Sequence, residues 1–203
     1  MANRLGSPNG MEQPRDVVFM LSTYPDARLA GQDYRAVKDL YYELNELARF
    51  DAVVVARQDK GELKLFKKPE FSTADAVWAG AGLGLAAGLA TAVAPDIAVG
   101  TGLMAGAAAA AGLGAVATHV ARGVGAVSLD EVSRRLHASA SALVVATPGD
   151  FTDRVQAILT TADTVLTAPA TIDTDHLTAD ARAAQQEARN GLDPRSAATL
   201  NGH

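Results

Sequence analysis

Residues 76–120 read AVWAGAGLGLAAGLATAVAPDIAVGTGLMAGAAAAAGLGAVATHV and hold a single charged residue, Asp96, in a chain that is 20% charged. Gly, Ala and Leu dominate this run, and Pro95 with Asp96 interrupts it near its middle. The arms on either side, residues 76–94 and 97–121, are each long enough for a helix. Two antiparallel helices joined by a tight turn are the simplest structure for this pattern. The run therefore predicts a helical hairpin.

Small residues recur at every fourth position of both arms. On a helix this spacing makes a stripe that is almost free of side chains, along which a second backbone can approach closely. Because a glycine inside a helix destabilises it by up to about 1 kcal/mol relative to alanine, close packing has to offset that loss. The stripes predict self-association through Gly80, Gly84, Gly88, Gly102, Gly106, Ala110 and Gly114.

The first arm has about the length of a membrane span, because about 19 helical residues extend over about 28 Å. Lys67 and Lys68 precede the arms and Arg122 follows them, which favours a hairpin with both ends on the cytoplasmic side. Trp78 suits an anchor at the membrane interface. Ala and Gly are only weakly apolar, so a second interpretation stays open. It is a soluble homo-oligomer, a shell or filament, in which hairpins of many copies pack into one apolar layer.

The segments around the run carry the patterns of a small α/β domain. Short apolar runs predict strands, and apolar residues spaced by three and four predict helices. Ser128 and Glu131 have capping-box spacing and predict the start of a helix. The expected elements are a strand at 16–24, a helix at 33–50, strands at 51–59 and 62–68, a helix from 128, a strand at 141–150, a helix from 150 to 162, a brief edge strand at 164–168 and a polar helix from 174.

Without the insertion, the order of elements is β-α-β-β-α-β, the ferredoxin-like order of an α+β fold. Several strands are apolar over consecutive residues, so we expect cover on both faces of the sheet. The predicted parts are a flexible arm (1–14), the first part of the α/β domain (15–70), the hairpin insertion (74–122), the second part of the domain (127–168) and a polar, partly helical extension (169–203).

Composition argues against several classes of function. The net charge is −5 and the Lys and Arg residues form no cluster, so nucleic acid is not an expected partner. The chain has no cysteine, which excludes disulfides, cysteine zinc sites and cysteine nucleophiles. Residues 1–16 are polar and lack the apolar core of a secretory signal.

No residue pattern predicts a reaction. GLGLAA at 82–87 and GLGAVA at 112–117 match the G-x-G-x-x-A dinucleotide pattern, but no strand directly precedes either match, as that site requires. The four histidines have no metal-ligand spacing. His119 is either a functional ionisable group near the end of the second arm or a helix-end histidine beside Arg122. We expect no catalytic residues, no cofactor and no metal, and hence no enzyme.

The order of these parts resembles a known family. The segments DAVVVARQDKGELKLFKKP, DAVWAGAGLGLAAGLATAVAP and SLDEVSRRLHASASALVVATPGDFTDRVQAIL are similar to bacterial and archaeal predicted membrane proteins whose domain has no assigned function. The resemblance covers about residues 16–166, and the extension after Ala168 departs from it. It implies a small α/β domain interrupted by a glycine-zipper hairpin, an association with stress responses and no established catalytic residues.

The sequence therefore predicts a non-enzymatic protein that self-associates through its hairpins. We expect a scaffold or stress-related component at the cytoplasmic membrane, with the α/β domain facing the cytoplasm. The soluble shell or filament is the alternative. A small-ligand sensor that uses an open face of the sheet is a further one.

Overall fold

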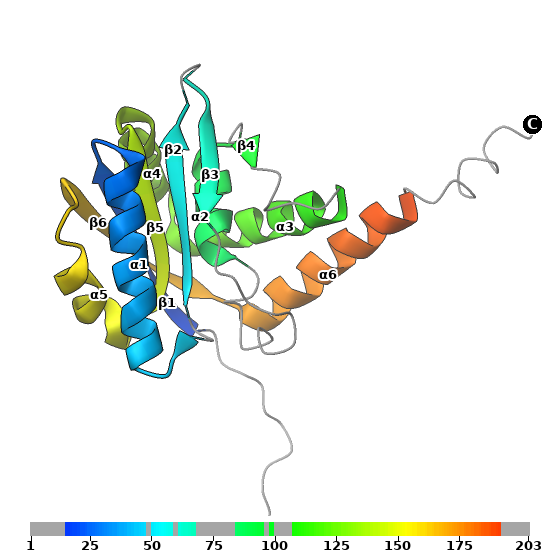
Figure 1. Ribbon diagram of the computed structural model, residues 1–203. Helices are drawn as coiled ribbons and strands as arrows, with labels where there is room; N and C mark the ends of the chain where they lie inside the picture. Colours follow the sequence, from blue (N-terminus) through cyan, green and yellow to red (C-terminus); the bar gives the residue numbers. More distant parts are fainter. Residues whose placement is uncertain are drawn as a thin grey trace, which may run out of the picture.

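The computed structural model describes residues 15–47, 50–58, 61–67, 84–95, 98–99 and 107–191. In this part of the chain, a six-stranded sheet lies between two layers of helices (Figure 1). The order across the sheet is β4-β3-β2-β5-β1-β6, and all neighbours are antiparallel except the short parallel pair of β3 and β4. The α+β class is therefore as predicted. The strands are β1 (Arg15–Tyr24), β2 (Asp51–Arg57), β3 (Leu63–Lys67), β4 (Ala98–Val99), β5 (Ser141–Pro148) and β6 (Thr164–Ile172).

Two helical connections each cross one intervening strand. Helix α1 (Ala27–Glu43) joins β1 to β2, and β5 lies between these strands. Helix α5 (Thr152–Ile158), which follows the 3-10 turn η3 (Gly149–Phe151), joins β5 to β6, and β1 lies between them. Because the intervening strand is antiparallel to both neighbours, the two joined strands run parallel.

A long segment of the chain separates β2 from β5, although these two strands are neighbours in the sheet. It contains β3, α2 (Leu85–Val93), β4, α3 (Ala107–Val124) and α4 (Ala126–Ala138). Strand β3 forms the predicted hairpin with β2, through a turn in which Gly61 has φ +82°. Helix α6 (Thr174–Gly191) follows β6 and has the predicted start. Helices α3 and α6 run side by side and extend beyond the sheet (Figure 1).

Both faces of the central strands are covered, as the continuous apolar runs predict. Alternate side chains of each strand enter opposite cores. Helices α1 and α5 cover one face, through Tyr34, Val37, Tyr41 and Val155. Helices α2, α3, α4 and α6 cover the other, through Leu85, Leu89, Val116, Val120, Val132, Leu136 and Leu177. The central strands are therefore buried between the two helical layers.

The predicted hairpin is wrong in its detail. The first arm is not one helix from residue 76, because α2 begins only after Gly84, whose φ of +68° cannot continue a right-handed helix. The second arm is extended at Ala98–Val99, where β4 pairs with β3, and its helix runs from Ala107 to Val124. Residues 68–83, 96–97 and 100–106 lie outside the described residues.

Other boundaries also differ. Helix α1 spans Ala27–Glu43 instead of 33–50, because Asp26 caps it by accepting a hydrogen bond from the backbone N–H of Leu29 at 2.9 Å. The capping box is wrong, since α4 begins at Ala126 and Glu131 pairs with Arg134 and Arg135. Helix α5 ends at Ile158, before the predicted 162. The brief edge strand is longer than predicted, since β6 pairs with β1 over its full length.

Among the helices that the structure describes, none has both the length and the apolarity that crossing a bilayer requires.

Candidate functional site

The predicted self-association residues have three different positions. Gly80, Gly102 and Gly106 lie outside the described residues, as do Lys68 and Trp78 from the predicted membrane flank. Gly84 is the N-cap of α2, and Gly88 lies inside that helix. Ala110, Gly114 and Arg122 belong to α3. Lys67 is the last residue of β3.

Gly88 brings α2 and α3 together within one chain. A Cβ at this position would lie 2.5 Å from Cγ1 of Val116, so only glycine permits the observed approach. Both residues are buried, and Leu89 and Val120 lie in the same core. The close helix contact that the sequence predicts is therefore present at Gly88, but it is an intramolecular contact.

Gly114 faces away from that contact. It is exposed, and a Cβ placed on it would have no heavy atom within 4 Å. Thr118 is exposed one turn further along α3, and Arg122 is exposed one turn beyond that. This spacing places the three residues on one side of the helix.

A shallow groove of about 520 Å³ lies along this side, between α2 and α3. Except for Arg122, its lining side chains are small: Thr91, Ala92, Pro95, Ala117, Thr118 and Ala121. The Thr91 hydroxyl donates to the Ala87 carbonyl at 2.9 Å, and the Thr118 hydroxyl donates to the Gly114 carbonyl at 3.0 Å. Both hydroxyls donate within their own helices. Covering the groove would therefore leave neither hydroxyl without a hydrogen-bond acceptor.

His119 lies on another side of α3. Its Nε2 is 2.7 Å from Oδ2 of Asp180 on α6, and its side chain is 16% exposed. Together with the buried Leu177 and Ala181, this pair attaches α6 to α3. His119 therefore pairs with a carboxylate of another helix, which neither of the two sequence interpretations included.

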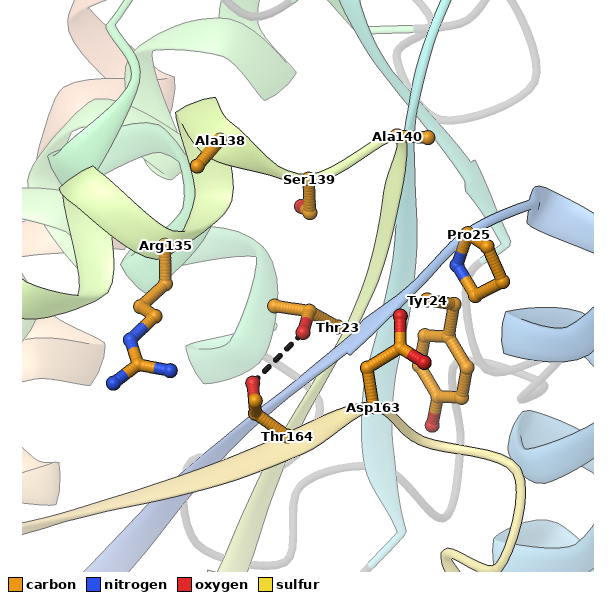
Figure 2. Close-up of a pocket in the computed structure, with 9 residues that line it drawn as sticks. All are labelled: Thr23, Tyr24, Pro25, Arg135, Ala138, Ser139, Ala140, Asp163 and Thr164. Carbon is orange, nitrogen blue, oxygen red and sulfur yellow. Dashed lines mark hydrogen bonds between the residues drawn. The ribbon is translucent and has the colours of Figure 1, made fainter.

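A second cleft lies at the edge of the sheet where β1 ends and β6 begins (Figure 2). This cleft of about 350 Å³ is lined by residues 23–25, at the end of β1 and in the following turn, by residues 163–164, where β6 begins, and by residues 135 and 138–140, in the last turn of α4 and just after it. The Thr23 and Thr164 hydroxyls are 2.8 Å apart, and the Asp163 backbone N–H donates to the Thr23 carbonyl at 2.9 Å. These bonds fix the start of β6 to the end of β1.

Two charged side chains stand on either side of that threonine pair: Arg135 on the α4 side and Asp163 on the other (Figure 2). The Nε of Arg135 donates to Oε1 of Glu131 at 2.7 Å. The pKa of Glu131 is lowered, chiefly by this hydrogen bond and by the charges of Arg134 and Arg135. Glu131 therefore holds the Arg135 guanidinium in place as a carboxylate.

Behind the cleft, Tyr24 is buried, and its hydroxyl donates to Oδ2 of Asp33 at 3.0 Å. The same oxygen accepts the backbone N–H of Thr161 at 3.2 Å. Burial, and then the nearby Asp33 carboxylate, raise the pKa of Tyr24. This buried pair connects α1 to the segment before β6 and gives the cleft a fixed back wall.

Within the described part of the chain, no group of three or more His, Asp or Glu side chains could hold a metal ion. The second dinucleotide match, 112–117, lies inside α3, so it is not the turn between a strand and a helix that binds a pyrophosphate. The first match contains Gly84 and continues into α2.

Among the residues that line the groove, sequence reasoning identified Arg122 but not the threonines and alanines. The four-residue spacing of Gly114 and Thr118 could have indicated them. The cleft residues come from three distant segments, and nothing in the sequence brings them together.

Comparison of the chain with protein-family models, with curated proteins and with solved structures gives no match. The resemblance to the predicted membrane proteins is therefore still a prediction, and the groove and the cleft have to be judged on their own geometry.

Proposed function

We propose that this protein is a non-enzymatic building block that self-associates, and that two copies meet through the groove between α2 and α3. The assembly surface comprises Thr91, Ala92, Pro95, Gly114, Ala117, Thr118, Ala121 and Arg122. The observation that carries the proposal is the exposed side of α3 at Gly114 and Thr118, two small residues along which another helix can approach closely. Arg122 follows one turn further along the same side.

A second copy is the occupant that this surface suits best. A two-fold axis brings the same patch of each copy together, so one surface of small residues supplies both sides of the contact. Because the two threonine hydroxyls donate within their own helices, they require no acceptor across the interface. Arg122 at the end of the groove can remain at the solvated rim.

We also propose that the body is a ferredoxin-like domain made of β1, α1, β2, β5, α5 and β6. The support is the order β6-β1-β5-β2 together with the two crossovers, β1-α1-β2 and β5-α5-β6. On this assignment the insertion lies between β2 and β5 and includes β3 and α4. The sequence interpretation instead uses β3 as the third strand and α4 as the second helix.

Membrane association remains part of the proposal because of the resemblance and of the flanking Lys67, Lys68 and Arg122. Flotation with lipid vesicles tests it independently of assembly. Recovery of the protein with the vesicles supports a membrane scaffold. Protein that stays at the bottom of the gradient, yet is oligomeric, supports the shell or filament instead.

Sedimentation velocity of the purified full chain tests self-association. The wild type should sediment as an oligomer, and Thr118→Arg should shift it to the monomer because a long charged side chain would occupy the groove. Ala183→Arg adds the same side chain at an exposed position of α6 and should leave the oligomer intact. A wild type that is monomeric at all concentrations, or a Thr118→Arg oligomer of unchanged size, would refute the proposal.

A further inference from the structure

The cleft between β1, β6 and the end of α4 is separate from the assembly surface and shares no residue with it. Its volume of about 350 Å³ is at the small end of the range for ligand sites, about 300–1,000 Å³. A ligand that fits it is therefore small.

The floor of the cleft offers hydrogen bonds of both kinds. In the Thr23 and Thr164 pair, one hydroxyl donates to the other across 2.8 Å. The accepting hydroxyl keeps its own hydrogen for a ligand, and the donating one keeps its lone pairs. Thr23 is only 8% exposed, so its position is fixed by the sheet.

The sides of the cleft carry opposite charges. Because the Nε of Arg135 is bound to Glu131, its two Nη groups remain for an acceptor in the cleft. Asp163 is exposed on the other side, and no ion pair within the described residues includes it. Figure 2 shows the hydroxyl pair between these two side chains.

These charges exclude most classes of small ligand. A simple anion would meet the Asp163 carboxylate, and a simple cation would meet the Arg135 guanidinium. An apolar ligand would desolvate both charges without replacing their hydrogen bonds. A molecule with one positive and one negative group satisfies both sides at once.

We propose that the cleft binds a small zwitterion of the α-amino acid class. The ligand carboxylate lies at the Nη groups of Arg135, and its ammonium group lies at Asp163 and the threonine hydroxyls. The inference does not depend on the proposed assembly, because a monomer has the complete cleft.

Thermal unfolding of the full chain with each of the twenty common L-amino acids tests the proposal. Butylamine and butyrate serve as probes that carry only one of the two charges. At least one amino acid should raise the midpoint of unfolding, and neither single-charge probe should do so. The proposal fails if no amino acid raises the midpoint, or if butyrate or butylamine raises it as much.

Two variants and a matched control localise the effect. Arg135→Gln and Asp163→Asn should each weaken binding of the active amino acid by about tenfold or more, because each removes one charged partner. Arg134→Gln removes the neighbouring arginine, which also binds Glu131 but does not line the cleft, and should leave the affinity unchanged. Undiminished binding by both cleft variants would overturn the proposal.

A nuclear magnetic resonance titration of the wild type gives a result that does not depend on the folding of the variants. Amide shifts centred on Thr23, Asp163 and Thr164 would support the site. Shifts confined to other parts of the chain would overturn it.

Discussion

Replacing Gly88 by alanine tests the close packing contact between α2 and α3. The added Cβ would lie 2.5 Å from Cγ1 of Val116 and 3.4 Å from its backbone carbonyl carbon, whereas carbon atoms in contact prefer about 3.5–4.0 Å. Val116 is 1% exposed and β-branched, so it has little freedom to rotate away. We therefore expect α3 to move or the core to become strained.

Two opposing terms set the magnitude. Overpacking of a well-packed core lowers the free energy of unfolding by about 1–3 kcal/mol, and replacing a helical glycine by alanine raises it by up to about 1 kcal/mol. Gly114→Ala is the matched control, because its Cβ meets no atom of the same chain within 4 Å, so within one copy only the favourable term applies. The two variants should differ in stability by about 1–3 kcal/mol, with Gly88→Ala the less stable.

Urea unfolding of both variants measures this difference, provided that the m-values agree. A double mutant, Gly88→Ala with Val116→Ala, should lose less stability than the two single changes together, because the clash is then absent. If Gly88→Ala is as stable as Gly114→Ala, the close contact between α2 and α3 does not exist as described.

Three further predictions concern other contacts. Gly123→Ala should lower the free energy of unfolding by about 1–3 kcal/mol in urea, because its Cβ would lie 2.7 Å from a methyl group and 3.0 Å from a backbone oxygen of β6; an unchanged midpoint would contradict the contact. Burial, and then the Asp33 carboxylate, raise the pKa of Tyr24, so the contribution of Tyr24 to stability is complete below its unfolded pKa of about 10 and decreases as the pH rises above it. Tyr24→Phe should therefore flatten the alkaline decrease in stability, and an unaltered slope would refute the burial of this hydroxyl beside Asp33. Asp180→Asn removes the partner of His119 at a largely exposed site, so global stability should change by less than about 1 kcal/mol while hydrogen exchange in α6 accelerates; unchanged exchange would show that the pair does not hold α6.

Sequence reasoning was most successful where side chains have strong preferences. The apolar run of β1 and the polar start of α6 at Thr174 gave boundaries that agree with the structure to within one residue. Strand β6 is longer than the predicted 164–168 and contains Pro169. At the edge of a sheet, a strand can contain a proline, since one side of its backbone has no ladder partner.

The Gly/Ala run was harder to interpret. Small side chains indicate that another segment can approach a helix closely, but they do not identify that segment. For Gly88 the partner is Val116 of the same chain, and for Gly123 it is β6. Glycine also allows the left-handed conformation at Gly84 that stops α2 from extending backward. The spacing of the glycines alone does not distinguish a glycine that allows close packing within the chain, or one that ends a helix, from a glycine in a self-association stripe.

Site-specific crosslinking tests the proposed assembly most directly, because the chain has no cysteine of its own. Three single-cysteine variants would be compared: Gly114→Cys, Thr118→Cys and the control Ala183→Cys. Each purified variant would be oxidised, and crosslinked dimers would be separated from monomers by gel electrophoresis without reductant. A disulfide requires the two Cα atoms to come within about 7 Å, so only residues near the contact between copies should link. We expect crosslinked dimers at position 114 or 118 and none at 183. Equal or absent crosslinking at all three positions would contradict self-association through the groove between α2 and α3.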